Sequence, residues 1–343
     1  MADVLLIGMG PTAPSALESL LTSCRVLGVV RPVQSPDDPV AALAARHRVK
    51  VFTETSVGAI DDLVKRLLPD CVVVSSYDRI LPPWVLARRP FVNVHYSPLP
   101  RYRGRANVNW AILNGEKSTA ISIHALEGDL DAGRILFQQE ISIGPADTVA
   151  DLYDRLNSIQ ARQLGPAIVR HLSGDPGMLQ NGEASYGCTR LPRDGEIDWR
   201  QPTAAIDALI RALVDPFPGA FTFLHGRRLT VWKAAPVADA PRYAGRVPGR
   251  IVAVSRANGH VDVLTGDGVL RLLDVQIEGA DPCAPASVIR SVKLTLGLST
   301  TDLLTRMQAL EHEVARLTTL LERAPAAAAR PDSMLARAEG GAR

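Results

Sequence analysis

The sequence is poor in features that mark several classes of protein. Its four cysteines, Cys24, Cys71, Cys188 and Cys283, lie far apart and form no CxxC pair. A zinc site or a disulfide framework is therefore not expected, and a reducing compartment is favoured. No apolar stretch approaches the roughly 20 residues needed to cross a bilayer, and the N-terminus shows no signal-peptide pattern. We expect a cytoplasmic protein with no membrane contact and no metal.

An excess of charge of one sign is also missing. The 343 residues include 38 Lys and Arg against 36 Asp and Glu, a net charge of +2. No run of basic residues resembles a nucleic-acid-binding arm. Hydrophobic residues make up 46% and charged residues 22% of the chain, which excludes a largely disordered protein. A chain of this length is long for one domain, so two domains are expected.

The first half alternates short apolar segments with helix-like segments. Strands are predicted at residues 4–7, 26–30, 71–75, 91–94 and 120–125, and helices at 13–21, 40–46 and 57–68. This alternation is typical of a parallel sheet buried on both faces. It predicts an α/β domain over residues 1–185 with a Rossmann-like, mostly parallel sheet. Ligands bind such sheets beyond the carboxyl ends of the strands, so chemistry is expected just after Ser75, Val94 and Ala125.

The second half has a different pattern. Gly, Pro, Asp and Asn accumulate before residue 203, and we assign residues 186–202 to a linker. A helix is predicted at 203–214, followed by strands at 221–224, 229–233, 249–255, 260–265 and 269–277, with a hairpin turn at Asp267-Gly268. Residues 203–298 are therefore predicted to form a smaller, largely β, barrel-like domain.

The C-terminal tail carries a heptad pattern. Its apolar residues follow one another at spacings of four and three: Leu303, Met307, Leu310, Val314, Leu317 and Leu321. This is the a/d pattern of a coiled coil. We predict a helix over residues 299–323 that forms a homodimer through 303–321, with docking on its own domain as the alternative. The Ala-, Pro- and Arg-rich residues 324–343 are predicted to be disordered.

Two polar motifs stand at predicted strand ends. Asn93 and His95 are two residues apart, so on a strand both side chains face the same way. An imidazole beside an amide donor can stabilise a developing oxyanion, although this pair alone also fits a hydrogen-bonded structural histidine. The second motif, residues 126–133, offers Asp129 and Asp131. Either carboxylate could raise the pKa of the histidine, and the spacing does not choose between them.

The order of these motifs resembles the folate-dependent formyltransferase family. The matching residues are Asn93-x-His95, Ser97-x-Leu99-Pro100, Arg103-Gly104 and Leu130-Asp131-x-Gly133, with further matches at 194–199, 210–212 and 215–221. The resemblance thus covers roughly residues 4–280. The family includes methionyl-tRNA formyltransferases and amino-sugar formyltransferases. Within it, the likeness is strongest to the formyltransferase half of the bifunctional aminoarabinose-forming enzymes.

The resemblance implies that a formyl group moves from 10-formyltetrahydrofolate to an amine, with no metal and no NAD. It assigns catalysis to Asn93, His95 and Asp131, with His95 held protonated or nearly so by the aspartate. It assigns the folate to loop residues: Ile80, Leu81, Pro82, Arg105, Glu127, Gly128, Asp129 and Leu130. We expect the acceptor to contact Tyr102, Arg103 and Trp110. Two positions depart from the family pattern: Pro98 stands where leucine is usual, and Asn107 where proline is usual.

The choice of acceptor depends on a single loop. The tRNA enzymes of the family have a long Lys/Arg-bearing loop after the second strand, whereas residues 31–39 are short and mildly acidic here. We therefore expect a small-molecule amine in place of tRNA, either a nucleotide-linked amino sugar or a precursor of a natural product or siderophore. Methionyl-tRNA formylation is the alternative.

Two other function classes are less consistent with the sequence. Gly8-Met-Gly10-Pro-Thr-Ala13 fits the GxGxxA fingerprint of a nucleotide-dependent oxidoreductase. However, prolines crowd the start of the following helix, and no acidic residue ends the second strand to hold a ribose. A non-catalytic folate-binding protein is disfavoured because all three catalytic identities are present.

Overall fold

The computed structural model describes residues 1–32 and 38–323. Residues Met1–Gly297 form one compact unit, and the chain from Leu298 onward forms a second. The predicted disordered tail, 324–343, lies outside the described residues. No described helix is long and apolar enough to cross a membrane, and the cytoplasmic location stays a prediction.

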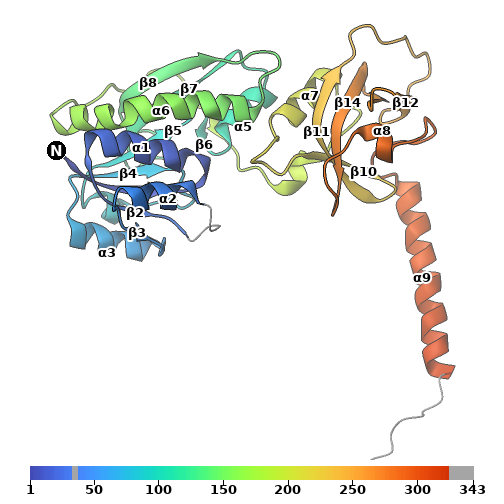
Figure 1. The fold of residues 1–343 in the computed structure, drawn as a ribbon, viewed down its shortest axis with the longest axis horizontal. Helices are drawn as coiled ribbons and strands as arrows, with labels where there is room; N and C mark the ends of the chain where they lie inside the picture. The colour runs from blue at the N-terminus through green and yellow to red at the C-terminus, as the bar shows by residue number, and fades with distance from the viewer. Residues whose placement is uncertain (33–37, 324–343) are drawn as a thin grey trace, which may run out of the picture. The chain divides into compact units, whose positions relative to one another are not determined.

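A seven-stranded sheet organises the N-terminal part of the first unit (Figure 1). Its strands are β1 (Asp3–Gly8), β2 (Arg25–Val30), β3 (Val51–Phe52), β4 (Cys71–Ser75), β5 (Phe91–His95), β7 (Ser118–Ala125) and β8 (Ile135–Ser142). Their order across the sheet is β3-β2-β1-β4-β5-β7-β8, and the first five in this order run parallel. The predicted α/β class with a mostly parallel sheet is confirmed.

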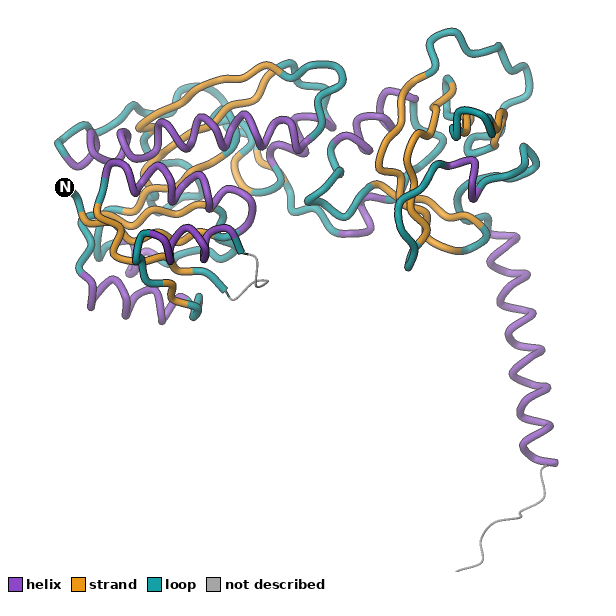
Figure 2. Tube along the Cα trace, viewed as in Figure 1, coloured by secondary structure: helices purple, strands orange, loops and turns teal. Residues whose placement is uncertain are grey.

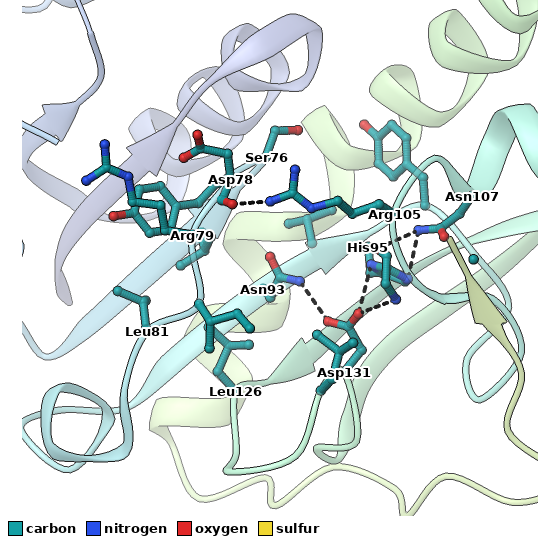
Figure 3. Close-up of a pocket in the computed structure, with 18 of the residues that line it drawn as sticks. Ser76, Asp78, Arg79, Leu81, Asn93, His95, Arg105, Asn107, Leu126 and Asp131 are labelled. Atoms are coloured by element: carbon teal, nitrogen blue, oxygen red, sulfur yellow. Dashed lines mark hydrogen bonds and ion pairs between the residues drawn. The ribbon is translucent and has the colours of Figure 1, made fainter. Parts of the chain in front are cut away.

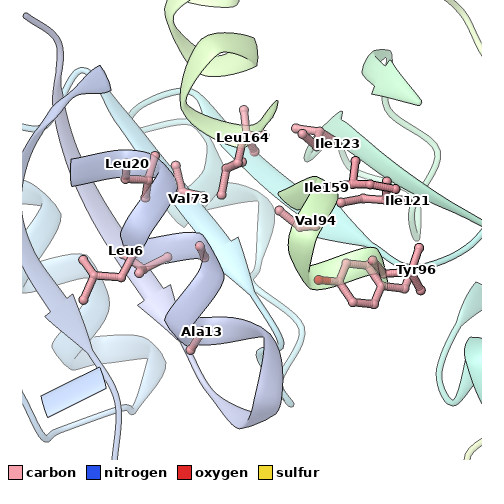
Figure 4. Packing of buried hydrophobic residues seen from close by; sticks show 14 of the residues in the cluster. Leu6, Ala13, Leu20, Val73, Val94, Tyr96, Ile121, Ile123, Ile159 and Leu164 are labelled. Carbon is pink, nitrogen blue, oxygen red and sulfur yellow. The ribbon is translucent and has the colours of Figure 1, made fainter. Parts of the chain in front are cut away.

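Helices cover the two faces of this sheet unequally. One face packs against α1 (Ala13–Ser23), α2 (Pro39–Arg46), α5 (Asn107–Leu113) and α6 (Val149–Leu172). Figure 4 shows this core, where Leu20 and Leu164 lie near Val73 of the sheet, and Ile159 lies near Ile121. The other face packs against α3 (Val57–Leu67) and the short α4 (Pro83–Leu86), mainly over β1 and β4. The same face of β5 and β7 carries polar side chains, and the candidate site lies there.

The predicted direction of residues 120–125 is wrong. β7 runs antiparallel to β5, with Ala125 opposite Val92 and Ser122 opposite His95. Ala125 therefore ends beside the start of β5, and the loop that follows has to return across the sheet face to reach His95. The physical reason is that a buried apolar strand has the same composition in either direction. The connection from β5 to β7, residues 96–117, is long enough for either direction, so its length does not indicate the direction of β7.

The rest of the first unit contains a five-stranded antiparallel sheet (Figure 2). Its strands are β10 (Ala220–Leu224), β11 (Arg227–Pro236), β12 (Ile251–Val254), β13 (Val261–Leu264) and β14 (Val269–Ile277), in the order β10-β11-β14-β13-β12. α7 (Thr203–Arg211) packs on this sheet, and α8 (Pro285–Val288) follows it. Residues 294–297 bridge the edge strands, because Ile251 N–H donates to Leu294 O and Gly297 N–H donates to Phe223 O. The predicted largely β character of this part is confirmed, and its division from the first half as a separate domain, residues 203–298, stays a prediction.

The second unit contains one described helix, α9 (Thr300–Arg323). It coincides with the helix predicted at 299–323. All six heptad residues are exposed, from 44% at Leu303 to 77% at Leu321. The homodimer through residues 303–321 stays a prediction, because the structure describes a single chain.

Candidate active site

A cavity of about 840 Å³ opens at the carboxyl ends of β1, β4 and β5. The chain reverses its order between β1 and β4, because β2 and β3 lie to one side and β5 to the other. Ligands of open α/β sheets bind at such a reversal. Three loops complete the walls: residues 76–81, 104–107 and 126–131 (Figure 3).

The structure brings the three predicted catalytic residues together in this cavity (Figure 3). Asn93 and His95 share one face of β5, as their spacing predicts. Asp131 Oδ2 lies 3.7 Å from His95 Nδ1 and accepts a hydrogen bond from Gly104 N–H at 2.9 Å. Asp131 Oδ1 lies 3.5 Å from Asn93 Nδ2. Both His95 and Asp131 are 6% exposed, whereas Asp129 is exposed on the cavity wall. The geometry favours Asp131 over Asp129 as the partner of the histidine.

The loop that carries Asp131 is held by a close backbone approach and by a side chain from another segment. At Gly133, a Cβ atom would lie 1.9 Å from the carbonyl oxygen of Ala125. Gln180 Nε2 donates to the carbonyl oxygens of Asp131 at 2.7 Å and Gly133 at 2.9 Å. Arg103 in turn donates to Gln180 Oε1 at 2.7 Å. The sequence analysis missed Gln180, which lies 49 residues beyond Asp131.

His124 is a second residue of this cluster that the sequence analysis missed. It is fully buried on β7, opposite Asn93. Its Nδ1 lies 2.8 Å from the carbonyl oxygen of Ala125, so Nδ1 carries the hydrogen and donates it there. Its Nε2 can then accept from Asn93 Nδ2 at 3.2 Å. The available signal was the alternation in β7, where Ser122 and His124 put polar groups on one face of an otherwise apolar strand.

His95 differs from the predicted protonated state. Burial is the largest influence on the pKa of His95 and lowers it; Asp131 raises it, and the net result is a pKa below the ordinary value. The ring is therefore neutral near pH 7. His95 Nε2 lies 2.8 Å from the carbonyl oxygen of Tyr102, so this nitrogen carries the hydrogen and Nδ1 faces Asp131 without one.

Asp131 is ionised in spite of its burial. Burial raises the pKa of Asp131, but the neighbouring His124 and His95 rings and the hydrogen bond from Gly104 N–H lower it by more. The pKa of Asp131 thus lies well below its ordinary value. A buried carboxylate that stays charged is suited to stabilise a cation that forms beside it.

Most of the predicted folate residues line the cavity. They are Ile80, Leu81, Arg105, Glu127, Gly128, Asp129 and Leu130. Pro82 is not among the described lining residues and forms the N-cap of α4. Ile80 is 84% and Leu130 is 51% exposed, so the cavity offers apolar surface against which a flat ligand can pack. Its volume is in the range that holds a drug-sized molecule, and these residues therefore fit a tetrahydrofolate.

The three residues predicted to contact the acceptor make other contacts. Tyr102 Oη donates to Glu116 Oε1 at 2.6 Å, and Arg103 is bound to Gln180. Trp110 Nε1 donates to the carbonyl oxygen of Cys188 at 2.9 Å, and the Arg190 guanidinium lies 5.1 Å from the Trp110 ring centre. None of the three is among the described residues that line the cavity. Their role toward the acceptor stays a prediction.

Comparison with known proteins identifies the family. Residues 27–168 match the formyl transferase family model, and residues 191–293 match the model of the formyl transferase C-terminal domain. The methionyl-tRNA formyltransferase of Caldanaerobacter subterraneus subsp. tengcongensis is 35% identical over 249 residues, which cover 71% of this chain and 78% of that protein. The chain belongs to the formyl transferase family. It is a formyl-group transferase that uses formyltetrahydrofolate.

A further relative supports the assignment, and one solved structure shares the fold of this formyltransferase. The methionyl-tRNA formyltransferase of Geobacter metallireducens is 32% identical over 266 residues, covering 76% of this chain and 83% of that protein. HypX from Aquifex aeolicus, solved in complex with tetrahydrofolic acid, shares the fold with a TM-score of 0.62 at 17% identity. That comparison covers 85% of this formyltransferase, which spans 47% of the HypX chain.

These relatives overturn one prediction. A small-molecule acceptor in place of tRNA was predicted for this formyltransferase, and this is wrong: four curated relatives at 31–35% identity are methionyl-tRNA formyltransferases. The prediction depended on one short surface loop, and surface loops vary among homologues more than the elements that they connect. Residues 33–37 of that loop also lie outside the described residues.

Proposed function

We propose that this formyltransferase moves the formyl group of 10-formyltetrahydrofolate to the amino group of methionyl-tRNA. The observation that carries the proposal is the match to methionyl-tRNA formyltransferases, at 31–35% identity over 71–80% of this chain. Arg79, exposed on the cavity wall, adds support because an arginine cation binds the phosphates of a nucleic acid.

The reaction sets three tasks for the protein. The amine nitrogen attacks the formyl carbon, and the carbonyl oxygen becomes negative. The attacking nitrogen then loses a proton to the protein, and that proton passes to the folate nitrogen as its bond to the formyl carbon breaks and the carbonyl forms again. The residues of the site must therefore orient the two reactants, stabilise an oxyanion and accept a proton.

We assign Asn93 to the oxyanion. Its Nδ2 carries two N–H groups; one donates to His124 Nε2 at 3.2 Å, and the contact with Asp131 Oδ1 at 3.5 Å is at the limit of a hydrogen bond. The N–H group that makes this weaker contact with Asp131 can instead donate to the oxygen of the formyl group. The loss of one oxyanion donor of this kind lowers kcat by about 10²–10³-fold.

We assign His95 to the proton. A neutral imidazole with its hydrogen on Nε2 has its lone pair on Nδ1, and Asp131 Oδ2 lies 3.7 Å from that nitrogen. Proton transfer to Nδ1 creates an imidazolium beside a carboxylate, which makes the charge easier to hold in a buried site. Asp131 itself is a weak base, because its pKa lies well below the ordinary value.

The pH profile tests this assignment. We expect kcat/KM to be flat near neutral pH and to fall on the acid side, at a pH below the ordinary histidine pKa, because burial lowers the pKa of His95. Initial rates measured across pH, with His95→Gln as the control that lacks this titration, give the answer. Activity that instead falls as the pH rises through the histidine range would show that the protonated ring is the active form.

The choice of acceptor is tested with a panel of amines and by salt dependence. We expect tetrahydrofolate release with methionyl-tRNA, and none with free methionine or a nucleotide-linked amino sugar. Because tRNA binding neutralises phosphates, KM for methionyl-tRNA should rise at least about tenfold between 50 and 200 mM salt, while KM for the folate stays within about twofold. Formylation of an amino sugar in the absence of any methionyl-tRNA activity would overturn the proposal.

A further inference from the structure

The exposed apolar stripe of α9 has no role in the site described above. Its heptad residues are 44–77% exposed, and Leu304 and Leu320 beside them are 53% and 52% exposed. Contiguous apolar surface of this kind marks an interaction site. The match to the C-terminal family domain ends at residue 293, so α9 lies outside the domains that carry the activity.

We propose that α9 pairs with α9 of a second copy of this chain as a parallel, in-register, two-stranded coiled coil. The spacing places Leu303, Leu310 and Leu317 at d positions, and Met307, Val314 and Leu321 at a positions. Leucine at every d position, with a β-branched residue at the central a position, favours two parallel strands.

The charged residues that flank the stripe select the same arrangement. Arg306 occupies a g position and Glu311 the following e position, and in a parallel pair these two positions face each other across the helices. The pairing therefore forms two Arg306–Glu311 ion pairs. Glu313, at the next g position, already forms an ion pair with Arg316 of its own helix at 2.6 Å.

The antiparallel alternative is disfavoured by the same residues. If the two stripes overlap fully in opposite directions, e positions face e positions and g positions face g positions. Glu311 then faces Glu311, and Glu313 faces Glu313, of the second copy. Like charges that face each other weaken such a pair.

Reversing the charges at Arg306 and Glu311 in the full-length protein tests whether α9 pairs with a second copy and whether the two helices are parallel and in register. By light scattering at tens of micromolar, we expect a dimer for the wild type, and monomers for Leu310→Asp. Arg306→Glu and Glu311→Arg should each weaken the dimer at least about tenfold, because each creates two like-charge pairs. An equal mixture of these two variants should dimerise again, because every facing pair then has opposite signs. The double variant should also dimerise.

The controls separate assembly from catalysis. Glu322→Arg changes the charge at a b position, which points away from the seam, and should leave the dimer intact. Activity per site should be equal in all these variants. A monomeric wild type would overturn the proposal. Single charge variants that dimerise like the wild type, or a mixture that stays monomeric, would overturn the parallel register.

Asn107 is an independent feature that belongs to the site itself. It is the first residue of α5, lines the cavity, and places its amide 3.0 Å from His95 Nε2 (Figure 3). With the amide oxygen toward the ring, it accepts the Nε2 hydrogen, and its nitrogen donates to the carbonyl oxygens of Tyr102 at 3.0 Å and Arg105 at 3.1 Å. This orientation satisfies every polar atom of the group.

We infer that Asn107 is a positioning residue that fixes the tautomer of His95, a role that rests on the proton-accepting function proposed for that histidine. Together with the Tyr102 carbonyl, the Asn107 oxygen keeps the hydrogen on Nε2 and leaves the lone pair on Nδ1, beside Asp131. Proline, which is usual here in the family pattern, has no side-chain acceptor. This chain therefore controls its histidine with a group that the pattern lacks.

Replacing Asn107 by aspartate changes the charge beside His95 and so provides a test of this inference. The titratable groups that face His95 are Asp131, 3.7 Å from Nδ1, and His124, with 6.1 Å between the ring centres. Asn107→Asp adds a carboxylate on the Nε2 side with little change in shape. An opposite charge this close should move the pKa of His95 upward by about one to three pH units.

Nitrogen NMR of the histidine rings in the full-length protein reads out tautomer and titration directly. We expect the wild type to carry the hydrogen on Nε2 and Asn107→Asp to titrate at higher pH. Asn107→Ala should show more of the Nδ1–H tautomer than the wild type, because the Tyr102 carbonyl is then the single acceptor that holds the hydrogen on Nε2. Asn107→Pro should behave like the alanine variant, because proline is tolerated at the first position of a helix. Identical His95 signals in all four proteins would overturn the inference.

The pH dependence of kcat/KM for formyl transfer distinguishes this inference from the proposed role of His95 as the base. If His95 accepts the proton, the acid limb of kcat/KM should shift in Asn107→Asp by the same amount as the NMR titration. A shifted NMR titration with an unshifted acid limb would leave Asn107 as the positioning residue and would remove His95 from the role of base.

Discussion

Replacing Asp131 by asparagine should lower kcat of formyl transfer by about two orders of magnitude or more. The amide keeps the shape of the side chain and can still accept the Gly104 N–H that Asp131 Oδ2 accepts at 2.9 Å. It cannot stabilise the imidazolium that forms at His95, whose Nδ1 lies 3.7 Å away. Steady-state rates at saturating folate and acceptor measure the loss, and an unchanged melting temperature shows that the fold is intact.

Asp129→Asn is the matched control for this experiment. It removes the same charge from the same loop, two residues away, where the side chain is exposed. We expect its kcat at saturating folate to stay within about twofold of the wild type, because a solvent-exposed charge acts weakly on a buried site. The loss of its predicted folate contact would appear in KM for the folate. A larger loss in Asp129→Asn than in Asp131→Asn would mean that the other carboxylate is the partner of the histidine.

Gly133→Ala should also lower kcat strongly, although residue 133 has no functional group. An added Cβ would lie 1.9 Å from the carbonyl oxygen of Ala125 and 2.8 Å from its carbon, and both are backbone atoms that cannot turn aside. The loop has to move, and Asp131 moves with it. Since an error of about 1 Å in placement can lower a rate by about 100-fold, we expect a loss of at least about tenfold, measured as kcat.

Gly128→Ala is the matched control for Gly133→Ala. It makes the same change in the same loop, but an added Cβ at residue 128 meets no atom within 4 Å. Its melting temperature and its kcat at saturating folate should match those of the wild type, and an effect on the predicted folate contact of residue 128 would appear in KM for the folate. The displaced loop of Gly133→Ala should lower the melting temperature, since forcing an atom into packed structure costs about 1–3 kcal/mol. Equal activity in the two variants would show that the close approach at Gly133 has no part in placing Asp131.

Local features of the sequence determined most of the elements and the family. The apolar segments predicted at 4–7 and 71–75 correspond to β1 and β4, and the heptad spacing corresponds to α9, because these signals depend only on neighbouring residues. The ordered motif around Asn93, His95 and Asp131 was enough to indicate formyl transfer. The prediction omitted β8 and α6, although Thr148 and Asp151 form a capping box at the start of that helix.

The tertiary structure decided the direction of β7 and the composition of the site. An apolar run has no direction, so only the pairing of Val92 with Ala125 shows that β7 is antiparallel. Gln180 joins Asp131 from 49 residues further along the chain, and His124 joins it because the loop between them folds back over the sheet; no local pattern contains either contact. The neutral state of His95 has the same origin: a pKa depends on burial and on nearby charges, and both arise only when distant segments pack around the ring.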